Sequence, residues 1–275
     1  MPLSSYSTFG IGGEASFFLP CKTIDDLAGG MSWAEENGII SLVIGHGSNC
    51  LFPDQGFPGL ILHNELVSFE DQGSGFFVVE AGYSFSLLGV QTCREGWSGL
   101  EFAAGIPGSV GGAIFMNAGA HGQETSLPLR FVEVLEHGKV QRIPRQEIRF
   151  GYRFSSFQEK KGIIVRAGFQ LQKDDASYSR QLQMLEQRKK TQPYRESSAG
   201  CVFRNPPGCS AGKLIEEVGL KGTRIGGAEI SPMHANFIVN SGGATSAQVK
   251  QLIDLVQSTV LEKRNVRLQC EVRLI

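Results

Sequence analysis

The sequence predicts a protein of mixed helices and strands, organised around two glycine-rich loops. Short apolar runs alternate along the chain with amphipathic segments of helical period. Residues 45–52 (GHGSNCLF) directly follow one apolar run, and residues 102–122 (FAAGIPGSVGGAIFMNAGAHG) form a glycine- and alanine-rich stretch in mid-chain. A change to polar composition at residues 172–177 predicts a boundary between two parts.

In the first half of the chain, two helices and several strands are predicted. Thr23 caps the first helix, with Asp26 three residues on, and its apolar face consists of Leu27, Met31 and Ala34. Ser84 caps the second helix, which closes at Gly96. Apolar runs predict strands at residues 40–44, 60–62, 76–81, 131–135, 140–143 and 163–171, with a hairpin turn at His137-Gly138.

The second half of the chain is predicted to be more helical. Residues 178–190 form a polar amphipathic helix, for which we expect Leu182 and Leu185 to point inward. A further helix lies around residues 214–218, and Thr245 with Gln248 forms a capping box at the start of the last one. The chain closes with a predicted strand at residues 268–275.

The central glycine stretch carries no charged side chain between Glu101 and Glu124, apart from any proton on His121. An anion held there would therefore have to be bound by backbone N–H groups. A tight glycine loop between sheet elements would explain the composition equally well. The loop at residues 45–52 has Cys50 in place of the third glycine of a dinucleotide fingerprint, which makes a Rossmann domain a poor match.

The overall composition excludes several classes of protein. Lys and Arg number 26 against 27 Asp and Glu, so there is no basic footprint for nucleic acid. No apolar run approaches the ~20 residues of a membrane helix, and the N-terminus lacks a signal pattern, which predicts a cytoplasmic protein. Six scattered cysteines without a C-x-x-C pair predict neither a metal site nor a disulfide framework.

Nine stretches of the chain together resemble one family, UDP-N-acetylenolpyruvoylglucosamine reductase. They occur in the family's order and span residues 7–275. They read STFGIGG, VIGHGSN, GLEFAAGIPGSVGGAIFMNAGAHG, YRFSSF, AGCVFRNPPG, AGKLIEEVGLKG, RIGGAEIS, HANFIVN and EVRLI. Residues 167–196 are too short for the lid insertion of the longer subtype, so the chain is similar to the shorter one.

The resemblance implies an α+β fold with non-covalently bound FAD. It implies an FAD-binding PCMH-type (vanillyl-alcohol-oxidase-like) domain at residues 1–172, with subdomains at about 1–64 and 65–172. An α+β substrate domain would occupy residues 173–275 and return a catalytic glutamate to the flavin on its last strand. The implied cofactor-binding residues are Gly45, His46, Gly47, Ser48, Asn49, Gly105, Pro107, Gly108, Ser109, Gly111, Gly112, Asn117 and Gly119.

The resemblance also implies a reaction, in which NADPH is the reductant and an enolpyruvyl ether of a UDP-sugar is reduced. Arg153 would hold the substrate carboxylate, Cys201 would donate a proton, and Glu271 would polarise the enolpyruvyl group. The substrate-binding residues implied are Tyr152, Asn205 and Lys213. The family most often has serine where this chain has Cys201. His46 stands where the family usually has glycine, and His121 where it commonly has tyrosine.

Less specific interpretations of these residues stay open at this point. Cys201 would also suit a buried structural thiol, and Arg153 or Glu271 an ordinary ion pair. Tyr152 could be a half-buried core residue, and Lys213 could face solvent. Two other functions remain, an FAD-linked oxidase or dehydrogenase of the same fold and a non-catalytic nucleotide-sugar binder. Neither nucleic acid nor membrane is expected as a partner, and the protein is expected to be a monomer.

Overall fold

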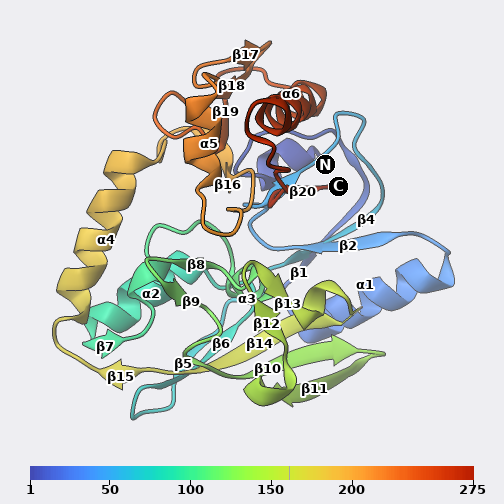
Figure 1. Cartoon of the computed structure of the whole chain (residues 1–275). Coiled ribbons are helices and arrows are strands. Elements are labelled where there is room, and N and C mark those ends of the chain that lie inside the picture. The colour runs from blue at the N-terminus through green and yellow to red at the C-terminus, as the bar shows by residue number, and fades with distance from the viewer. Residues whose placement is uncertain (161) are drawn as a thin grey trace. The chain divides into compact units, whose positions relative to one another are not determined.

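The computed structural model describes residues 1–160 and 162–275, which divide into two compact units (Figure 1). The central unit consists of Phe17–His46 and Gly59–Gln187. The terminal unit consists of Met1–Ser16, Gly47–Pro58 and Arg188–Ile275. The chain therefore leaves the central unit within the first glycine loop and returns to it at Gly59.

The central unit is built on an antiparallel five-stranded sheet in the order β11-β10-β14-β6-β5. Its strands are β5 (Phe69–Asp71), β6 (Phe76–Glu80), β10 (Leu129–Glu136), β11 (Lys139–Pro144) and β14 (Ile163–Gln170). The predicted turn between β10 and β11 is confirmed, with His137 at φ 48° and Gly138 at φ 72°. Positive φ at both residues is what a two-residue type I′ hairpin requires.

Helices cover both faces of this sheet. On one face lie α2 (Phe85–Arg94) and α3 (Val110–Met116), which bury Phe85, Leu88 and Ile114 in the same cluster as Ile164 of β14. On the other face, Ile163 and Val165 pack with Leu27 of α1 (Ile24–Glu36). A three-stranded sheet, β1 (Ala15–Cys21), β4 (Phe57–Asn64) and β2 (Ser41–Ile44), completes that layer. The predicted caps of α1 and α2 at Thr23 and Ser84 are confirmed.

Short elements connect these layers in the central unit. They are β7 (Trp97–Ser98), η2 (Glu101–Ala103), β8 (Gly119–Ala120), β9 (Gln123–Glu124), η3 (Arg145–Glu147), β12 (Phe150–Gly151), β13 (Phe154–Ser155), η4 (Ser156–Gln158) and β15 (Gln172–Lys173).

Helix α4 (Ser177–Thr191) forms where the sequence predicts it, but it turns a different face inward. Leu182 is 42% exposed, so its predicted burial is wrong. The buried residues are Ser177 and Gln181 instead. Polar contacts set this orientation, because the Ser177 hydroxyl donates to the Cys93 carbonyl and Arg180 reaches the buried Glu101.

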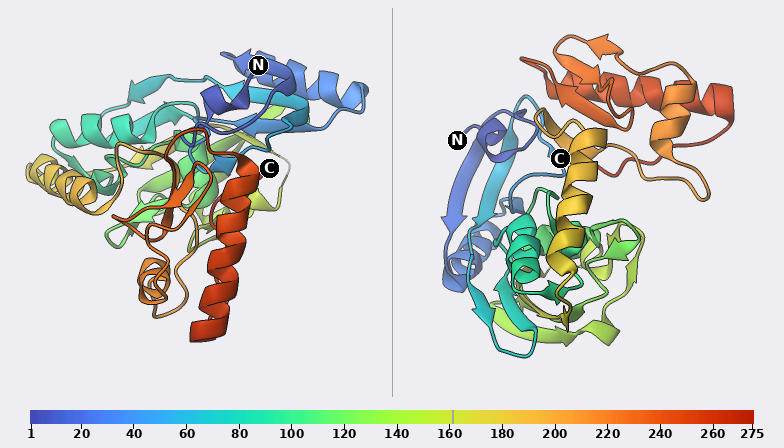
Figure 2. Two further views of the ribbon diagram at one scale, coloured as in Figure 1. Left: turned by 90° about the horizontal axis from the view of Figure 1, so that it is seen from above. Right: turned by 90° about the vertical axis from the view of Figure 1, so that its left-hand side faces the viewer.

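The terminal unit has a sheet in the order β16-β19-β18-β17, packed against α5 and α6. Figure 2 shows α6, in red, running along this sheet. The elements are η1 (Leu3–Tyr6), β3 (Cys50–Leu51), β16 (Ser197–Cys201), α5 (Ala211–Glu217), β17 (Arg224–Ile225), β18 (Ala228–Ile230), β19 (Phe237–Asn240), α6 (Ser246–Arg264) and β20 (Arg273–Leu274). The predicted capping box of Thr245 and Gln248 is confirmed, and the Asp54 carboxylate also accepts from Ser246 N and Ala247 N.

The closing strand is much shorter than predicted, because only Arg273–Leu274 is regular strand. Helix α6 ends at Asn265 with a left-handed φ of 55°. In the segment that follows, the backbone hydrogen bonds do not form a regular ladder. The N–H groups of Glu271 and Val272 both donate to the Val202 carbonyl. The alternation of apolar residues at 268–275 predicts a strand, but it does not show whether a neighbouring strand is there to pair with it.

Candidate active site

In the central unit the two glycine loops touch each other. A Cβ built on Gly45 would lie 2.2 Å from the Ser109 hydroxyl oxygen and 2.9 Å from its Cβ. No side chain fits between the loops at this point, so glycine at position 45 is a requirement of close approach. Gly45 of the first loop and Ser109 of the second, far apart in the sequence, are therefore in direct contact.

Next to this contact, both loops have backbone N–H groups that the protein itself does not use. Within residues 1–160 and 162–275, no acceptor receives the N–H of His46, Gly108 or Ser109. Neighbouring N–H groups are satisfied: Gly105 donates to the Ser86 hydroxyl and Val110 to the Tyr83 carbonyl. Unused donors on a loop without charged side chains suit a bound phosphate or diphosphate.

In the terminal unit the remainder of the first loop lies equally close to its own backbone neighbours. A Cβ on Gly47 would meet the Tyr6 carbonyl oxygen at 1.9 Å, and φ at Gly47 is 58°. No described acceptor receives the N–H groups of Gly47 and Ser48. Gly47 and Ser48 therefore also have backbone N–H groups that a ligand could use.

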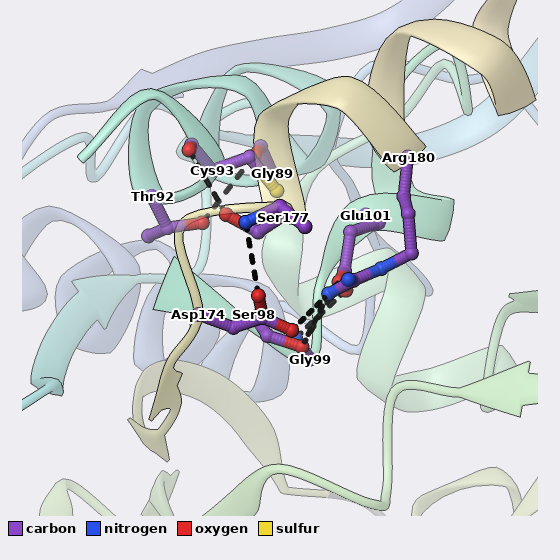
Figure 3. Close-up of polar contacts among 10 residues, drawn as sticks. Gly89, Thr92, Cys93, Ser98, Gly99, Glu101, Asp174, Ser177 and Arg180 are labelled. Carbon is purple, nitrogen blue, oxygen red and sulfur yellow. Dashed lines mark hydrogen bonds and ion pairs between the residues drawn. The ribbon is translucent and has the colours of Figure 1, made fainter. Parts of the chain in front are cut away.

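A buried polar cluster anchors the start of the second loop (Figure 3). The Glu101 carboxylate is fully buried and accepts from Ser98 Oγ at 2.9 Å and from Gly99 N at 2.7 Å. Arg180 of α4 donates to it from Nη2 at 2.7 Å and also reaches Asp174 at 2.8 Å. Glu101 opens η2, and the glycine loop follows at once, so the cluster fixes where the loop begins.

Asn117, a predicted cofactor residue, uses its side chain on the protein. It is fully buried at the end of α3, with a left-handed φ of 44°. Its Nδ2 donates to Glu124 Oε2 at 2.8 Å and to the Gly151 carbonyl at 2.9 Å, and its Oδ1 accepts from Ser126 N at 3.1 Å. Asn117 therefore ties the second loop to the hairpin that carries Tyr152 and Arg153.

Arg153 lies in the two-residue turn between β12 and β13 and has a strained backbone. Its φ is 55°, a value that favours glycine. The guanidinium donates to the Gly119 carbonyl at 3.0 Å, and its Cζ lies 5.0 Å from the centre of the Tyr152 ring. Tyr152 is 46% exposed, which excludes a core role. A costly conformation at a non-glycine residue is typical of functional positions.

In the terminal unit, Glu271 is hydrogen-bonded to Asn49 and to the residue that follows Cys201. Glu271 N donates to the carbonyl of Val202, the residue after Cys201, at 2.7 Å. The Glu271 carbonyl accepts from Asn49 Nδ2 at 3.1 Å. Cys201 and Glu271 are both half-buried, at the end of β16 and just before β20. The predicted residues Asn49 and Glu271, distant in sequence, are thus in contact, and Cys201 lies next to the residue that binds the Glu271 N–H.

The remaining predicted substrate residues lie at the start of α5, also in the terminal unit. Asn205 Oδ1 accepts from Ala211 N at 2.9 Å, and Ser210 caps the helix. The Lys213 side chain is 77% exposed and lies 3.8 Å from Glu217. Both residues therefore border the same helix start, with the lysine directed to solvent.

Sequence reasoning missed the anchoring residues. Glu101 marks the beginning of the charge-free stretch, which was a usable signal. Arg180 sits on a helix rich in polar residues and nothing in the sequence distinguishes it. Its role follows only from the fold, in which α4 places Arg180 against Glu101 of η2.

Similarity to named proteins along the whole chain decides the family. UDP-N-acetylenolpyruvoylglucosamine reductase of Protochlamydia amoebophila is 52% identical over 274 residues, which cover 99% of this chain and 92% of that protein. The protein of the same name from Chlamydia trachomatis serovar D is 46% identical, covering 100% and 94%. The chain belongs to the UDP-N-acetylenolpyruvoylglucosamine reductase family.

Further comparisons agree with this family. The crystal structure of UDP-N-acetylenolpyruvylglucosamine reductase from Thermus caldophilus superposes with a TM-score of 0.86 at 36% identity, covering 100% of this chain and 97% of that one. An FAD binding domain model matches residues 15–143. The model of the family's C-terminal domain matches residues 192–275. The α+β, FAD-binding fold expected from the resemblance is confirmed.

Family members carry FAD and use NADPH, and the residues of this chain fit an FAD diphosphate. The fit rests on the unused N–H groups of His46, Gly108 and Ser109 and on the contact of Gly45 with Ser109. Across the described residues, no group of His, Cys, Asp and Glu is arranged to hold a metal ion. None of the described helices has the length and apolarity to cross a membrane.

Proposed function

We propose that this protein reduces UDP-N-acetylglucosamine enolpyruvate to UDP-N-acetylmuramate, with NADPH as the source of reducing equivalents. Similarity to reductases of that name along essentially the whole chain carries the proposal. The local geometry supports it, because both glycine loops offer unused N–H donors and Glu271 is hydrogen-bonded to the residue after Cys201.

The backbone of the two glycine loops would hold the FAD diphosphate. The residues involved in this cofactor site would be Gly45, His46, Gly47, Ser48, Asn49, Gly105, Pro107, Gly108, Ser109, Gly111, Gly112, Asn117 and Gly119. For Asn117 the role is indirect, since its side chain is committed to Glu124, Gly151 and Ser126. Asn49 would contribute through its backbone alone, since its side-chain amide donates to the Glu271 carbonyl. Bound FAD supplies the hydride, which it takes from NADPH.

Arg153 binds the carboxylate of the enolpyruvyl group. Hydride addition to the terminal carbon drives electron density onto that carboxylate, and a planar guanidinium stabilises the charge through two parallel hydrogen bonds. The left-handed backbone of Arg153 supports this role, since such strain persists where function requires it. Tyr152, Asn205 and Lys213 bind other parts of the substrate, with the exposed lysine suited to its diphosphate.

Cys201 donates the proton that completes the reduction, to the carbon next to the carboxylate. A thiol has a reference pKa of about 8.5 and releases its proton far more readily than an aliphatic hydroxyl. Glu271 polarises the enolpyruvyl group. Hydride and proton together add two hydrogens across the double bond, so the reaction balances with one NADPH consumed.

Anaerobic stopped-flow absorbance tests the reaction. The protein is reduced with one equivalent of NADPH and then mixed with UDP-N-acetylglucosamine enolpyruvate. We expect the flavin absorbance to bleach and then to recover on addition of substrate. Bleaching without recovery by substrate, together with rapid recovery in O₂, would instead identify an FAD-linked oxidase. A protein that takes up no FAD would be a binder without catalysis.

The proton donor is tested with Cys201→Ala and Cys201→Ser. We expect Cys201→Ala to bleach normally with NADPH but to recover about 100-fold more slowly on substrate, the usual loss on removing a general acid. Cys201→Ser should retain much of the rate, because the hydroxyl occupies the same position. Wild-type recovery in Cys201→Ala would show that the thiol is structural.

A further inference from the structure

We infer that Asn49 is a positioning residue for Glu271, which it holds through its side-chain amide rather than using that amide on the cofactor. The inference rests on the role proposed above for Glu271. It assigns Asn49 a contribution to the second half of the reaction, after the flavin has been reduced. The backbone of the same loop remains available to the FAD diphosphate.

Asn49 bonds the C-terminal segment through both its side chain and its main chain. Its Nδ2 donates to the Glu271 carbonyl at 3.1 Å. Its main-chain carbonyl accepts from Arg273 N at 2.9 Å. Asn49 therefore holds both Arg273, the first residue of β20, and Glu271, which lies two residues before it. Asn49 and Glu271 are 222 positions apart in the sequence.

The Asn49 side chain bonds the backbone of Glu271 beyond the end of the β3–β20 ladder. β3 and β20 pair in parallel over Cys50–Arg273 and Leu51–Leu274, and the ladder stops there. Glu271 lies two residues before Arg273, outside this ladder. An asparagine amide can bond backbone groups in this way, which extends the constraint by one step to Glu271.

With this bond, both peptide groups that flank the Glu271 Cα are fixed. Its N–H is held by the carbonyl of Val202, the residue after Cys201, at 2.7 Å. Its carbonyl is held by Asn49. The bond from Asn49 Nδ2 thus connects Glu271 to the first glycine loop. The bond to the Val202 carbonyl connects it to the segment that contains Cys201. Rotation of either peptide would redirect the carboxylate.

The test separates the two halves of the reaction in Asn49→Ala. We expect FAD affinity within about two-fold of wild type and an unchanged rate of bleaching by NADPH. Recovery of flavin absorbance on UDP-N-acetylglucosamine enolpyruvate should slow by about ten- to a hundred-fold, as expected when a reacting group is displaced by about 1 Å. Should Asn49→Ala not fold, Asn49→Asp keeps the shape and also lacks the N–H donor.

Asn240→Ala is the control, because Asn240 also bonds a distant backbone carbonyl elsewhere in the terminal unit. Its Nδ2 donates to the Phe9 carbonyl, also at 3.1 Å and between residues far apart in sequence. Its Oδ1 accepts in addition from Gly242 N and Ala244 N, so this variant loses more hydrogen bonds than Asn49→Ala. Losing these bonds should lower the thermal midpoint but leave recovery on substrate at the wild-type rate. A similar slowing in both variants would mean that general loosening, and not the position of Glu271, is responsible, and would overturn the inference.

Glu271→Gln distinguishes failure of the inference from failure of the proposed role. If Glu271→Gln recovers on substrate at the wild-type rate, the role of Glu271 is wrong and the inference falls with it. If Glu271→Gln is slow while Asn49→Ala is normal, only the inference fails. Loss of FAD from Asn49→Ala would overturn it too, since the amide would then serve the cofactor directly.

Discussion

Arg180 donates two hydrogen bonds to a single oxygen of the buried Glu101 carboxylate, from Nη2 at 2.7 Å and from Nε at 3.2 Å. The pair joins α4 to the residue that opens η2, and so to the start of the second glycine loop. Burial alone would raise the pKa of Glu101, but the bonds from Arg180, Gly99 N–H and Ser98 outweigh it and hold the pKa below its usual value.

Glu101 should therefore contribute to stability in a pH-dependent way. Its folded pKa lies below the unfolded one, so the contribution is complete above the unfolded value of about 4.3 and is lost as pH falls through the folded pKa. We expect Glu101→Gln to cost about 2–3 kcal/mol at pH 7. Urea unfolding at a series of pH values should show wild type and variant converging in acid. An equal gap at every pH would contradict this account.

The contact between Gly45 and Ser109 predicts a pair of compensating substitutions. Gly45→Ala would force the loops apart, at a cost of about 1–3 kcal/mol, or roughly a ten- to hundred-fold loss of FAD affinity. Ser109→Gly alone removes a helix cap for a few tenths of a kcal/mol. Titration of the apoprotein with FAD should show that the double variant regains most of the affinity. If it binds no better than Gly45→Ala, the clash is not the cause.

At position 153 the residue that suits the left-handed backbone best, glycine, lacks the guanidinium that the reaction needs. Both Arg153→Gly and Arg153→Ala remove the guanidinium and should abolish turnover of the enolpyruvyl substrate. Glycine relieves the left-handed backbone whereas alanine does not, so Arg153→Gly should be the more stable of the two by about 1 kcal/mol. Thermal or urea midpoints of the two variants measure this directly. Equal midpoints would mean that the turn relaxes without cost.

Asn117 should be intolerant of an acid at its position. Asn117→Asp would face Glu124 Oε2 and the Gly151 carbonyl, both acceptors, and we expect a loss of at least about 2–3 kcal/mol. Asn265→Asp is the matched control, since Asn265 ends α6 with the same left-handed backbone but is exposed. That variant should stay within about 0.5 kcal/mol of wild type. Comparable losses in both would point to the backbone conformation instead.

Several helix starts and one turn were predictable because the residues that form them are close together in the sequence. Thr23 with Asp26 and Thr245 with Gln248 begin helices through bonds that span three residues, and His137-Gly138 supplies the backbone of its hairpin turn. The face of α4 was not predictable in this way. Leu182 lies on the solvent side because Ser177 and Arg180 find partners in Cys93 and Glu101, which are distant in sequence.

The sequence by itself determined the two charge-free glycine loops, the Cys201 and Glu271 segments and the family to which they are similar. Each is a property of consecutive residues, so it can be recognised without knowing what lies nearby. Only the tertiary structure decided what these residues contact: Gly45 against Ser109, Asn49 on the Glu271 carbonyl, and Arg180 on Glu101. Such contacts depend on how sheets and helices pack, and a hydrogen bond across 222 positions leaves no pattern in the chain itself.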